Sequence, residues 1–449
     1  MNNLKVGFAR IDITPMMGIS LAGYFKDRFA DGILDNIEMN AMAFECGDKR
    51  VILICLDHLG VRAVVANEFR DAISKATGVP FDAIFITATH THTAPYIRPI
   101  PADELEAEYK QSVLRKIVDL SVFALEDMKP ARMGFGTGKA PGVAFVRRFR
   151  MKDGSIQTNP GVNNPDILEP LGTVDETVNV VRFDREGADT LLIVNFANHP
   201  DTVGGNKISG DWPGFLRRTV EKSIDGTKVM YFNGAQGDVN HVNVHPKGGD
   251  FNDMFMDFDD VSRGYGHARY IGRVVAGGVF QCYDKVEYVD VDSIDFIEKT
   301  VSLPSNRPSP EQMPEARRIN DLHMAGRDGE IPYTGMMLTT VVAEAERMIK
   351  LENGPDFFDL NMLCVRLGKV GLVGIAGEPF TGIGVALRDT PGYDMVMTVC
   401  TVNGDEGYFP MRSAYKEGGY ESRSSEFREG VAEQLIDTGK ALLKDIAQK

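Results

Sequence analysis

The sequence predicts an α/β fold, a large single domain in which layered mixed β-sheets are flanked by helices. Apolar, β-branched runs alternate with helical spacing, beginning with Val51–Leu56, the helical segment Val64–Ala76 and the run Ala83–Ala88. Runs that are apolar almost throughout are typical of strands buried on both faces. The candidate functional residues extend from His90 to Tyr420, so most of the 449-residue chain is expected to fold around one centre.

The next elements follow in chain order. Glu104–Ala124 predicts a helix, because its apolar residues recur at helical spacing, whereas residues 131–180 are rich in Gly, Pro and Asn and predict loops and short hairpins. A long loop containing Asp and Gly, at about residues 245–262, precedes a helix through Ala268–Phe280. Residues 285–303 have the alternation of a strand pair.

Residues of about 304–352 interrupt this α/β alternation. After a proline-containing linker, two charged helices are predicted at about 311–326 and 337–351. We interpret them as a helical insertion, which either covers a site as a lid or packs as a surface appendage. A last helix is expected over Ser425–Asp445, which makes residues 1–449 one domain without internal repeats.

Composition limits the partners and the compartment. The formal net charge of −15 argues against nucleic acid or an anionic membrane surface as the main partner. The 5 cysteines are odd in number and widely spaced, which predicts free thiols in a reducing, cytoplasmic compartment. No signal peptide and no apolar stretch of membrane-spanning length is visible, so stable membrane insertion is not expected. A chain whose leader peptide had been removed would show the same sequence, so a removed leader is the alternative to this expectation.

Two histidines, His90 and His92, follow the predicted strand that ends at Ala88. The chain contains only 8 histidines. In extended backbone alternate side chains share one face, so both imidazoles are expected to point into one cavity. Neutral imidazole is a common zinc ligand, and the pair therefore favours a metal or catalytic site over histidines that only cap the strand end with hydrogen bonds.

Other predicted strands also end in side chains that bind metals or transfer protons. These are Asp57-His58, Asn198-His199-Pro200-Asp201, the stretch from Asn233 through Asp238 to His241, Glu378, and the stretch from Asn403 to Tyr408. In α/β sheets, sites gather just beyond the carboxyl ends of strands. The strand ends together predict the floor of an enzyme active site.

A catalytic zinc needs about three protein ligands and an open position for water. His90 and His199 are the best nitrogen candidates, and Glu378 supplies a carboxylate at a strand end, where burying an unpaired acid would be costly. The alternatives are a hydrogen-bonded core histidine for His199 and an acid at a helix N-terminus for Glu378. The set contains no cysteine, which favours a catalytic site over a structural one.

Several segments resemble motifs of the neutral/alkaline ceramidases, in order along nearly the whole chain. Ala88–Pro95 resembles the family's Ala-Thr-His-Thr-His-Ser-Gly-Pro, and Gly377–Thr381 is similar to its Pro-Gly-Glu-Phe-Thr. The other matching segments are Arg10–Pro15, Gly23-Tyr24, Phe196–His199, Ser209–Gly214, and the set Tyr408, Tyr415 and Tyr420-Glu421.

The resemblance implies a zinc-dependent hydrolase that cleaves the N-acyl amide bond of a small-molecule or lipid-like substrate, as in sphingolipid metabolism. It implies that the zinc ligands are His90, His199, Glu378 and Tyr408. His92, Arg147 and Tyr420 are expected to support the zinc ligands or to orient the substrate. In such a mechanism His92 or Tyr420 helps to stabilise the oxyanion, and His92 or Asp238 protonates the leaving amine.

Two departures from the family affect this expectation. Asn240 stands where ceramidases have a serine implicated in catalysis, and an amide cannot act as a nucleophile. The chain also ends soon after the Tyr420 motif, without room for the family's C-terminal β-sandwich domain. A metal-dependent esterase or other hydrolase with a changed, soluble substrate is therefore an alternative. A non-catalytic binding protein with a relic site is another, although retention of all four proposed ligands argues against it.

Overall fold

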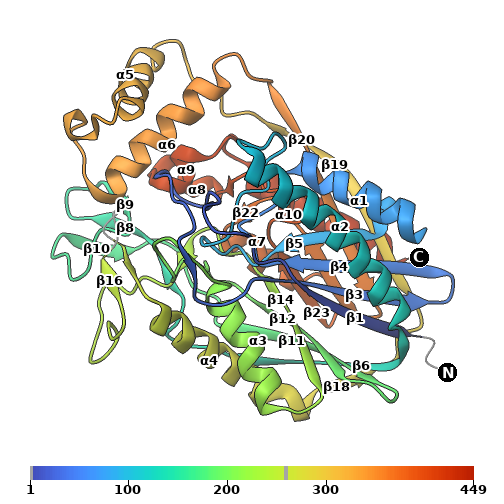
Figure 1. The fold of residues 1–449 in the computed structure, drawn as a ribbon. Coiled ribbons are helices and arrows are strands. Elements are labelled where there is room, and N and C mark those ends of the chain that lie inside the picture. The colour runs from blue at the N-terminus through green and yellow to red at the C-terminus, as the bar shows by residue number, and fades with distance from the viewer. Residues whose placement is uncertain (1–3, 257–260, 449) are drawn as a thin grey trace.

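The computed structural model describes residues 4–256 and 261–448 (Figure 1). Its largest sheet has the strand order β14-β12-β11-β6-β1-β3-β4-β5, with β18 paired to β6. The strands are β1 (Lys5–Asp12), β3 (Glu38–Cys46), β4 (Lys49–Leu56), β5 (Ile84–Ala88), β6 (Lys129–Lys139), β11 (Thr177–Arg185), β12 (Thr190–Phe196), β14 (Thr227–Asn233) and β18 (Glu287–Val289). The sheet is mixed, because β4 and β5 pair in parallel, as do β12 and β14, whereas β3 pairs antiparallel with β1 and β4.

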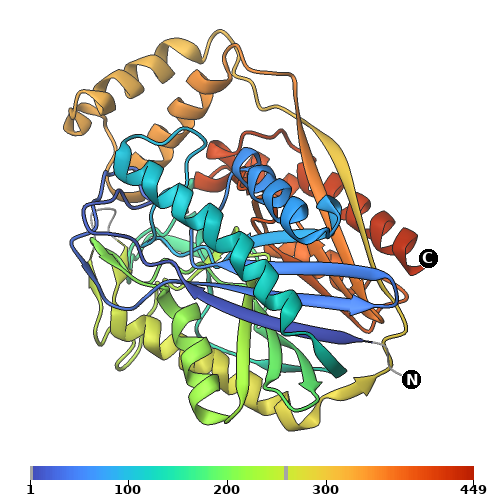
Figure 2. The same cartoon turned by 45° about the vertical axis from the view of Figure 1, so that its right-hand side comes forward.

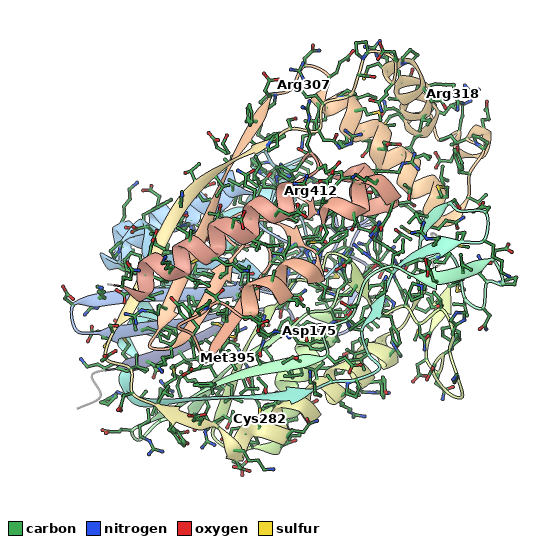
Figure 3. The ribbon with its side chains drawn as sticks, turned by 180° about the vertical axis from the view of Figure 1, so that it is seen from behind. Asp175, Cys282, Arg307, Arg318, Met395 and Arg412 are labelled. Atoms are coloured by element: carbon green, nitrogen blue, oxygen red, sulfur yellow. The ribbon has the colours of Figure 1, made fainter. Side chains whose placement is uncertain are left out.

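A second sheet packs against the first. It has the order β19-β20-β21-β23, with β19 (Ile294–Pro304), β20 (Phe357–Leu367), β21 (Val370–Gly374) and β23 (Met395–Val399). Phe85 and Phe232 of the large sheet share one buried core cluster with Leu372 and Met397 of the second sheet. Burying this apolar surface between the sheets stabilises their packing. An ion pair also links the two sheets: Asp175 precedes β11 of the large sheet, and its partner Arg388 lies between β21 and β23 of the second sheet. Asp175 is labelled in Figure 3, which shows the molecule from behind.

Helices cover both sheets. α1 (Ala63–Thr77) and α2 (Glu104–Glu126) pack together, and α2 crosses the strands β1 and β3 (Figure 2). α3 (Asp211–Ser223) and α4 (Tyr265–Cys282) pack against β14, β6 and β11, whereas α7 (Thr381–Arg388) and α10 (Val431–Ala447) cover the second sheet. In the described part of the chain no helix combines the length and apolarity needed to cross a bilayer.

Short strand pairs and short helices complete the site region. The pairs are β2 (Gly32–Ile33) with β13 (Lys207–Ile208), β7 (Phe145–Val146) with β15 (Val239–Asn240), β16 (Phe255–Met256) with β17 (Ser262–Arg263), and β22 (Glu378–Pro379) with β24 (Tyr408–Phe409). β8 (Arg148–Met151), β9 (Ile156–Thr158) and β10 (Ile167–Pro170) form a small sheet, and α8 (Arg412–Glu417) and α9 (Tyr420–Ser424) lie before α10.

The predicted α/β class with layered mixed sheets is confirmed, and so are the helices α2 and α4. The predicted insertion contains α5 (Met313–Met324) and α6 (Gly335–Leu351), which project from the sheets at the upper left of Figure 1. The predicted loop at 245–262 includes residues 257–260, which lie outside the described part of the chain.

Two expectations are wrong, and a third holds only in part. The stretch expected to hold loops and short hairpins, residues 131–180, has loops and the short strands β7 to β10 over residues 140–176, but it begins with most of the long strand β6. The glycines of β6 allow α4 to approach: a Cβ at Gly138 would lie 1.9 Å from the Gly278 carbonyl oxygen. The expected strand pair at 285–303 is not a pair, because β18 joins the large sheet and β19 joins the second sheet. The last helix begins at Val431 rather than Ser425.

Candidate metal centre

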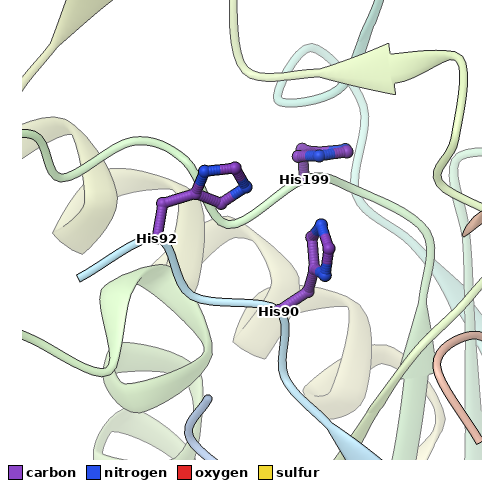
Figure 4. A group of neighbouring side chains, drawn as sticks. All are labelled: His90, His92 and His199. Carbon is purple, nitrogen blue, oxygen red and sulfur yellow. The ribbon is translucent and has the colours of Figure 1, made fainter. Parts of the chain in front are cut away.

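Three buried histidines form a cluster just beyond the ends of β5 and β12. The ligand nitrogen atoms of His90, His92 and His199 all lie within 4.8 Å of one another. The ring centroids are separated by 4.7 Å for His90–His199, 5.2 Å for His90–His92 and 5.4 Å for His92–His199. Figure 4 shows the three rings around one common space, into which a metal ion would fit.

The backbone reaches this arrangement differently from the expectation of an extended strand. β5 ends at Ala88, and His90 has a φ of 73°, in the left-handed region that non-glycine residues seldom adopt. The His90 backbone N–H donates to the His58 carbonyl oxygen at 2.8 Å, which holds the turn. Strained conformations of this kind cluster at functional sites and cost about 1–3 kcal/mol each. His90 and His92 therefore face one space because the chain turns, and not because strand residues alternate.

Each histidine directs one ring nitrogen into the cluster. The Nδ1 atoms lie 2.6 Å from the Leu59 carbonyl oxygen for His90, 3.1 Å from that of Gly23 for His92, and 3.4 Å from that of Gln236 for His199. A carbonyl oxygen only accepts, so each Nδ1 carries a proton, and in the neutral form of the ring the Nε2 keeps a lone pair. The buried His92 Nε2 has no hydrogen-bond partner. Nδ1–H bonded to a backbone carbonyl is the outer-shell arrangement that orients metal-binding histidines.

The carboxylate of Glu378 completes the donor set. Its Oε2 lies 3.4 Å from the Nε2 atoms of both His90 and His199, and it accepts a hydrogen bond from Gln236 Nε2 at 3.1 Å. For zinc–ligand bonds of about 2.0–2.1 Å, neighbouring ligands of a tetrahedral site lie about 3.4 Å apart. The distances from Glu378 Oε2 to the two Nε2 atoms therefore fit a zinc ion.

The protonation states also suit a metal ion. Burial lowers the pKa of His92 to about 4 and lowers the pKa of His199 well below its usual value, so both are neutral near pH 7. Burial alone would raise the pKa of Glu378, but the neighbouring charges of His90 and Arg147 outweigh it and lower that pKa. His90 differs from the other two: burial lowers its pKa, but the charge of Glu378 and the hydrogen bond to it outweigh burial and raise that pKa, so a bound metal ion would displace a proton from His90 Nε2. The neutral His92 and His199 and the ionised Glu378 are in the forms that bind zinc.

Tyr408 lies next to Glu378 in the backbone register. β22 and β24 pair in parallel, with Glu378 directly opposite Tyr408. Burial, followed by the nearby Glu378 charge, raises the pKa of the Tyr408 phenol well above its usual value. The ring centroid of Tyr408 lies 5.6 Å from that of Tyr420 and 5.2 Å from the guanidinium carbon of Arg147.

A buried ion cluster holds Arg147 against this site. Arg147 Nε lies 2.7 Å from Glu421 Oε1, and Arg147 Nη2 donates to the Gly237 carbonyl oxygen at 2.6 Å. Glu421 is fully buried; its Oε2 lies 3.8 Å from Arg148 Nε and accepts a hydrogen bond from Thr158 Oγ1 at 3.0 Å. The carboxylate of Glu421 therefore fixes the arginine that faces the tyrosines.

A small cavity opens above the histidines. Its volume is about 60 Å³. Its walls combine polar and apolar side chains from the N-terminal loop, the strand ends and helix α6, namely Tyr24, Phe25, His92, Arg147, Asn159, His199, Asp201, Asn240, Val261, Arg263, Met336, Thr339, Tyr408 and Tyr420, together with Gly23. Six of the nine predicted site residues line it, and His90 and Glu378 lie beneath them.

Comparison with solved structures identifies the fold of the chain. The chain aligns over its full length, with a TM-score of 0.74 and 16% identity, with 75% of a neutral ceramidase crystal structure from Pseudomonas aeruginosa. A second structure, a ceramidase complexed with C2, aligns with a TM-score of 0.72 and 17% identity. That alignment covers 99% of this chain and 76% of the second structure. The chain has the fold of the neutral ceramidases.

The sequence resemblance is more limited than the structural one. The chain is 26% identical over 243 residues to the neutral ceramidase of Mycobacterium tuberculosis (strain ATCC 25618 / H37Rv). That match covers 51% of this chain and 37% of the relative, so it spans little more than a third of the relative's length. No protein-family model matches the chain.

The position of the missing ceramidase serine lies at the cavity wall. The Asn240 side chain donates to Asn159 Oδ1 at 3.0 Å and accepts from the Val242 backbone N–H at 3.0 Å. Asn240 therefore has a fixed orientation and a second amide N–H. Asp238, in contrast, is not a cavity-lining residue; its Oδ1 accepts hydrogen bonds from the backbone N–H and the hydroxyl of Thr381, at 2.7 and 2.8 Å, where α7 begins.

Some strand-end residues lie elsewhere, and other site residues were missed. Asp57 forms an ion pair with Arg217, and His58 Nε2 lies 2.8 Å from the Tyr109 hydroxyl, so neither joins the cluster. Glu421 and Gly23 were not predicted as site residues, although both lie in segments that resemble ceramidases. Gly23 has a φ of 102°, and a Cβ there would lie 2.6 Å from His92 Nδ1. Only a glycine fits this contact.

Proposed function

We propose that the protein is a zinc-dependent hydrolase that cleaves an N-acyl amide bond. The observation that carries the proposal is the convergence of buried, lone-pair-bearing Nε2 atoms with Glu378 Oε2 at the 3.4 Å spacing of a zinc site. A bound zinc ion lowers the pKa of water to about 7 and polarises a carbonyl group. The ceramidase fold and the sequence match support amide hydrolysis as the reaction.

His90, His199 and Glu378 would hold the metal. Tyr408 is the fourth ligand by the ceramidase resemblance, and its register opposite Glu378 supports this assignment. The position of His92 in the histidine cluster makes its Nε2 the alternative fourth ligand. The two assignments predict different losses of metal affinity. If Tyr408 is the fourth ligand, Tyr408→Phe lowers the affinity strongly and His92→Ala does not; if His92 is the fourth ligand, the reverse holds.

With Tyr408 as the ligand, His92 is free to transfer protons. Its Nε2 lone pair accepts a proton from the attacking water and returns it to the nitrogen of the leaving amine. Asp201 Oδ1, 3.7 Å from His92 Nδ1, stabilises the transient imidazolium. Tyr420 keeps its phenolic proton, because burial raises its pKa, and donates it in a hydrogen bond to the developing oxyanion. Arg147 adds positive charge, and Asp238 positions Thr381 at the start of α7.

The zinc-loaded protein is expected to hydrolyse soluble short-chain amides faster than ceramide embedded in anionic vesicles. The reasons are the net charge of −15, which an anionic surface repels, and the small, partly polar cavity. Release of the amine is measured side by side for both substrates, with chelator-treated protein as the control. Faster hydrolysis of the vesicle-embedded ceramide would refute the preference for a soluble substrate. If neither substrate is hydrolysed in a metal-dependent way, the proposed reaction is refuted.

Asn240→Ala is expected to lower kcat/KM by about tenfold, because losing one hydrogen-bond donor in the transition state costs about 1.4 kcal/mol. The zinc content should not change. Asn240→Ser restores the residue type of the ceramidases and is expected to raise activity on ceramide-like amides. Asn243→Ala, outside the cavity, is the matched control. Complete loss of activity in Asn240→Ala with zinc retained would show that Asn240 takes part in the chemistry itself.

A further inference from the structure

Helix α6 forms part of the roof of the cavity, through Met336 and Thr339. The space of about 60 Å³ is small: at 10–15 Å³ for each water-sized probe, it holds about four to six water molecules. Pockets that enclose drug-sized ligands measure about 300–1,000 Å³. A long acyl chain therefore does not fit between the histidine cluster and α6.

The roof is tied to the same segment that supplies Tyr420 and Glu421. Arg347 of α6 donates from Nε to the Arg423 carbonyl oxygen at 2.8 Å. Glu344 pairs with the Arg423 guanidinium, and Lys350 pairs with Glu426. Because Arg347 is buried, removing its contacts would leave a guanidinium without acceptors. These bonds hold α6 at a fixed height above the cavity.

Met336 lies between the cavity and an apolar cluster. It packs against the group formed by Phe149, Met151, Val242, Val244 and Val261, of which Val261 also lines the cavity. Shortening this side chain would connect the cavity to the apolar surface behind it. Methionine fills irregular gaps with a flexible chain, so its removal opens space without leaving a buried polar group unpaired.

We propose that this cavity selects amides whose acyl group is no longer than butyryl, and that Met336 sets that limit. The inference rests on the proposed amide hydrolysis and names its substrate class: soluble amides with a short acyl group. The polar wall formed by Arg147, Asn159, Asn240 and Asp201 suits a compact polar substrate. The apolar side next to Met336 accommodates the few carbons of the acyl group.

The test uses the zinc-loaded 449-residue chain and a series of ethanolamine amides with acetyl, butyryl, octanoyl and palmitoyl groups. Release of ethanolamine gives kcat/KM for each substrate below its aggregation concentration. For the wild type we expect kcat/KM to fall at least about tenfold from butyryl to octanoyl. Met336→Ala is expected to raise the octanoyl-to-acetyl ratio of kcat/KM about tenfold, and Met336→Trp to lower the butyryl-to-acetyl ratio.

Met324→Ala is the matched control, because Met324 lies on α5 of the same insertion and is 74% exposed. Its chain-length profile should equal that of the wild type. A wild type that hydrolyses the octanoyl or palmitoyl amide as well as the acetyl amide would overturn the inference, even if Met336→Ala fails to fold. An unchanged profile in folded Met336→Ala would overturn the role of Met336. Hydrolysis of none of the amides would instead refute the proposed function.

Discussion

His199→Ala and His90→Ala are each expected to abolish zinc binding, from about one ion per chain to none, and to lower the hydrolysis rate by about 10³-fold or more. Each change removes an Nε2 atom 3.4 Å from Glu378 Oε2, and with it a third of the minimal ligand set. A metal-activated water contributes several kcal/mol to the transition state, and about 1.4 kcal/mol corresponds to a factor of ten. Metal content is measured by elemental analysis of the purified variants.

The control for both variants is His245→Ala, because His245 is exposed and lies outside the cluster. Circular dichroism spectra should show that all three variants are folded. Full retention of zinc in both His90→Ala and His199→Ala would disprove the proposed centre. Loss of zinc without loss of hydrolysis would disprove the catalytic role of the metal, but it would still support a metal-binding site at these histidines.

Glu421→Ala is expected to destabilise the fold by about 3–5 kcal/mol, the usual cost of removing one partner from a buried ion pair. The change would leave the guanidinium groups of Arg147 and Arg148, whose side chains are 7% and 4% exposed, without the carboxylate between them. Unfolding in urea, with a chelator present to remove any contribution from bound metal, gives the free energy of unfolding.

Glu417→Ala provides the comparison for this effect. Glu417 also pairs with Arg148, at 3.0 Å, but its side chain is 24% exposed and the buried Glu421 remains. We expect a loss below about 1 kcal/mol, as for exposed ion pairs. A loss for Glu421→Ala that is no larger than for Glu417→Ala would contradict the view that Glu421 holds the two arginines in place.

The strands and most helices were predictable, because their patterns are local. The runs that became β4, β5, β12, β14 and β23 are apolar almost throughout, which is typical of strands buried on both faces. The pairing of β18 and β19 with different sheets was not predictable, because pairing depends on contacts with distant segments and not on alternation within 285–303.

For the site, residue type and position at strand ends were sufficient to find the histidines and Glu378. The left-handed turn at His90 is not visible in the local sequence. The expectation that alternate residues of an extended strand share one face therefore placed His90 and His92 in one space correctly, but for an incorrect reason. Tyr408 and Arg147 came only from the ceramidase resemblance, since phenol and guanidinium groups are uncommon beside a metal. The partnership of Arg147 with Glu421 joins positions far apart in the sequence and required the three-dimensional structure.

The residues proposed to hold the metal come from segments that are synthesised at different times. His90, His92 and His199 lie in the first half of the chain, whereas Glu378 and Tyr408 lie near its end. Glu378 follows His199 by roughly 180 residues, which a ribosome adds in about 10–40 s at 5–20 residues per second. The nascent chain therefore carries the nitrogen donors well before the carboxylate. A metal ion that meets the growing polypeptide encounters imidazoles alone, and the complete ligand set exists only once the second sheet has been translated and has packed against the first.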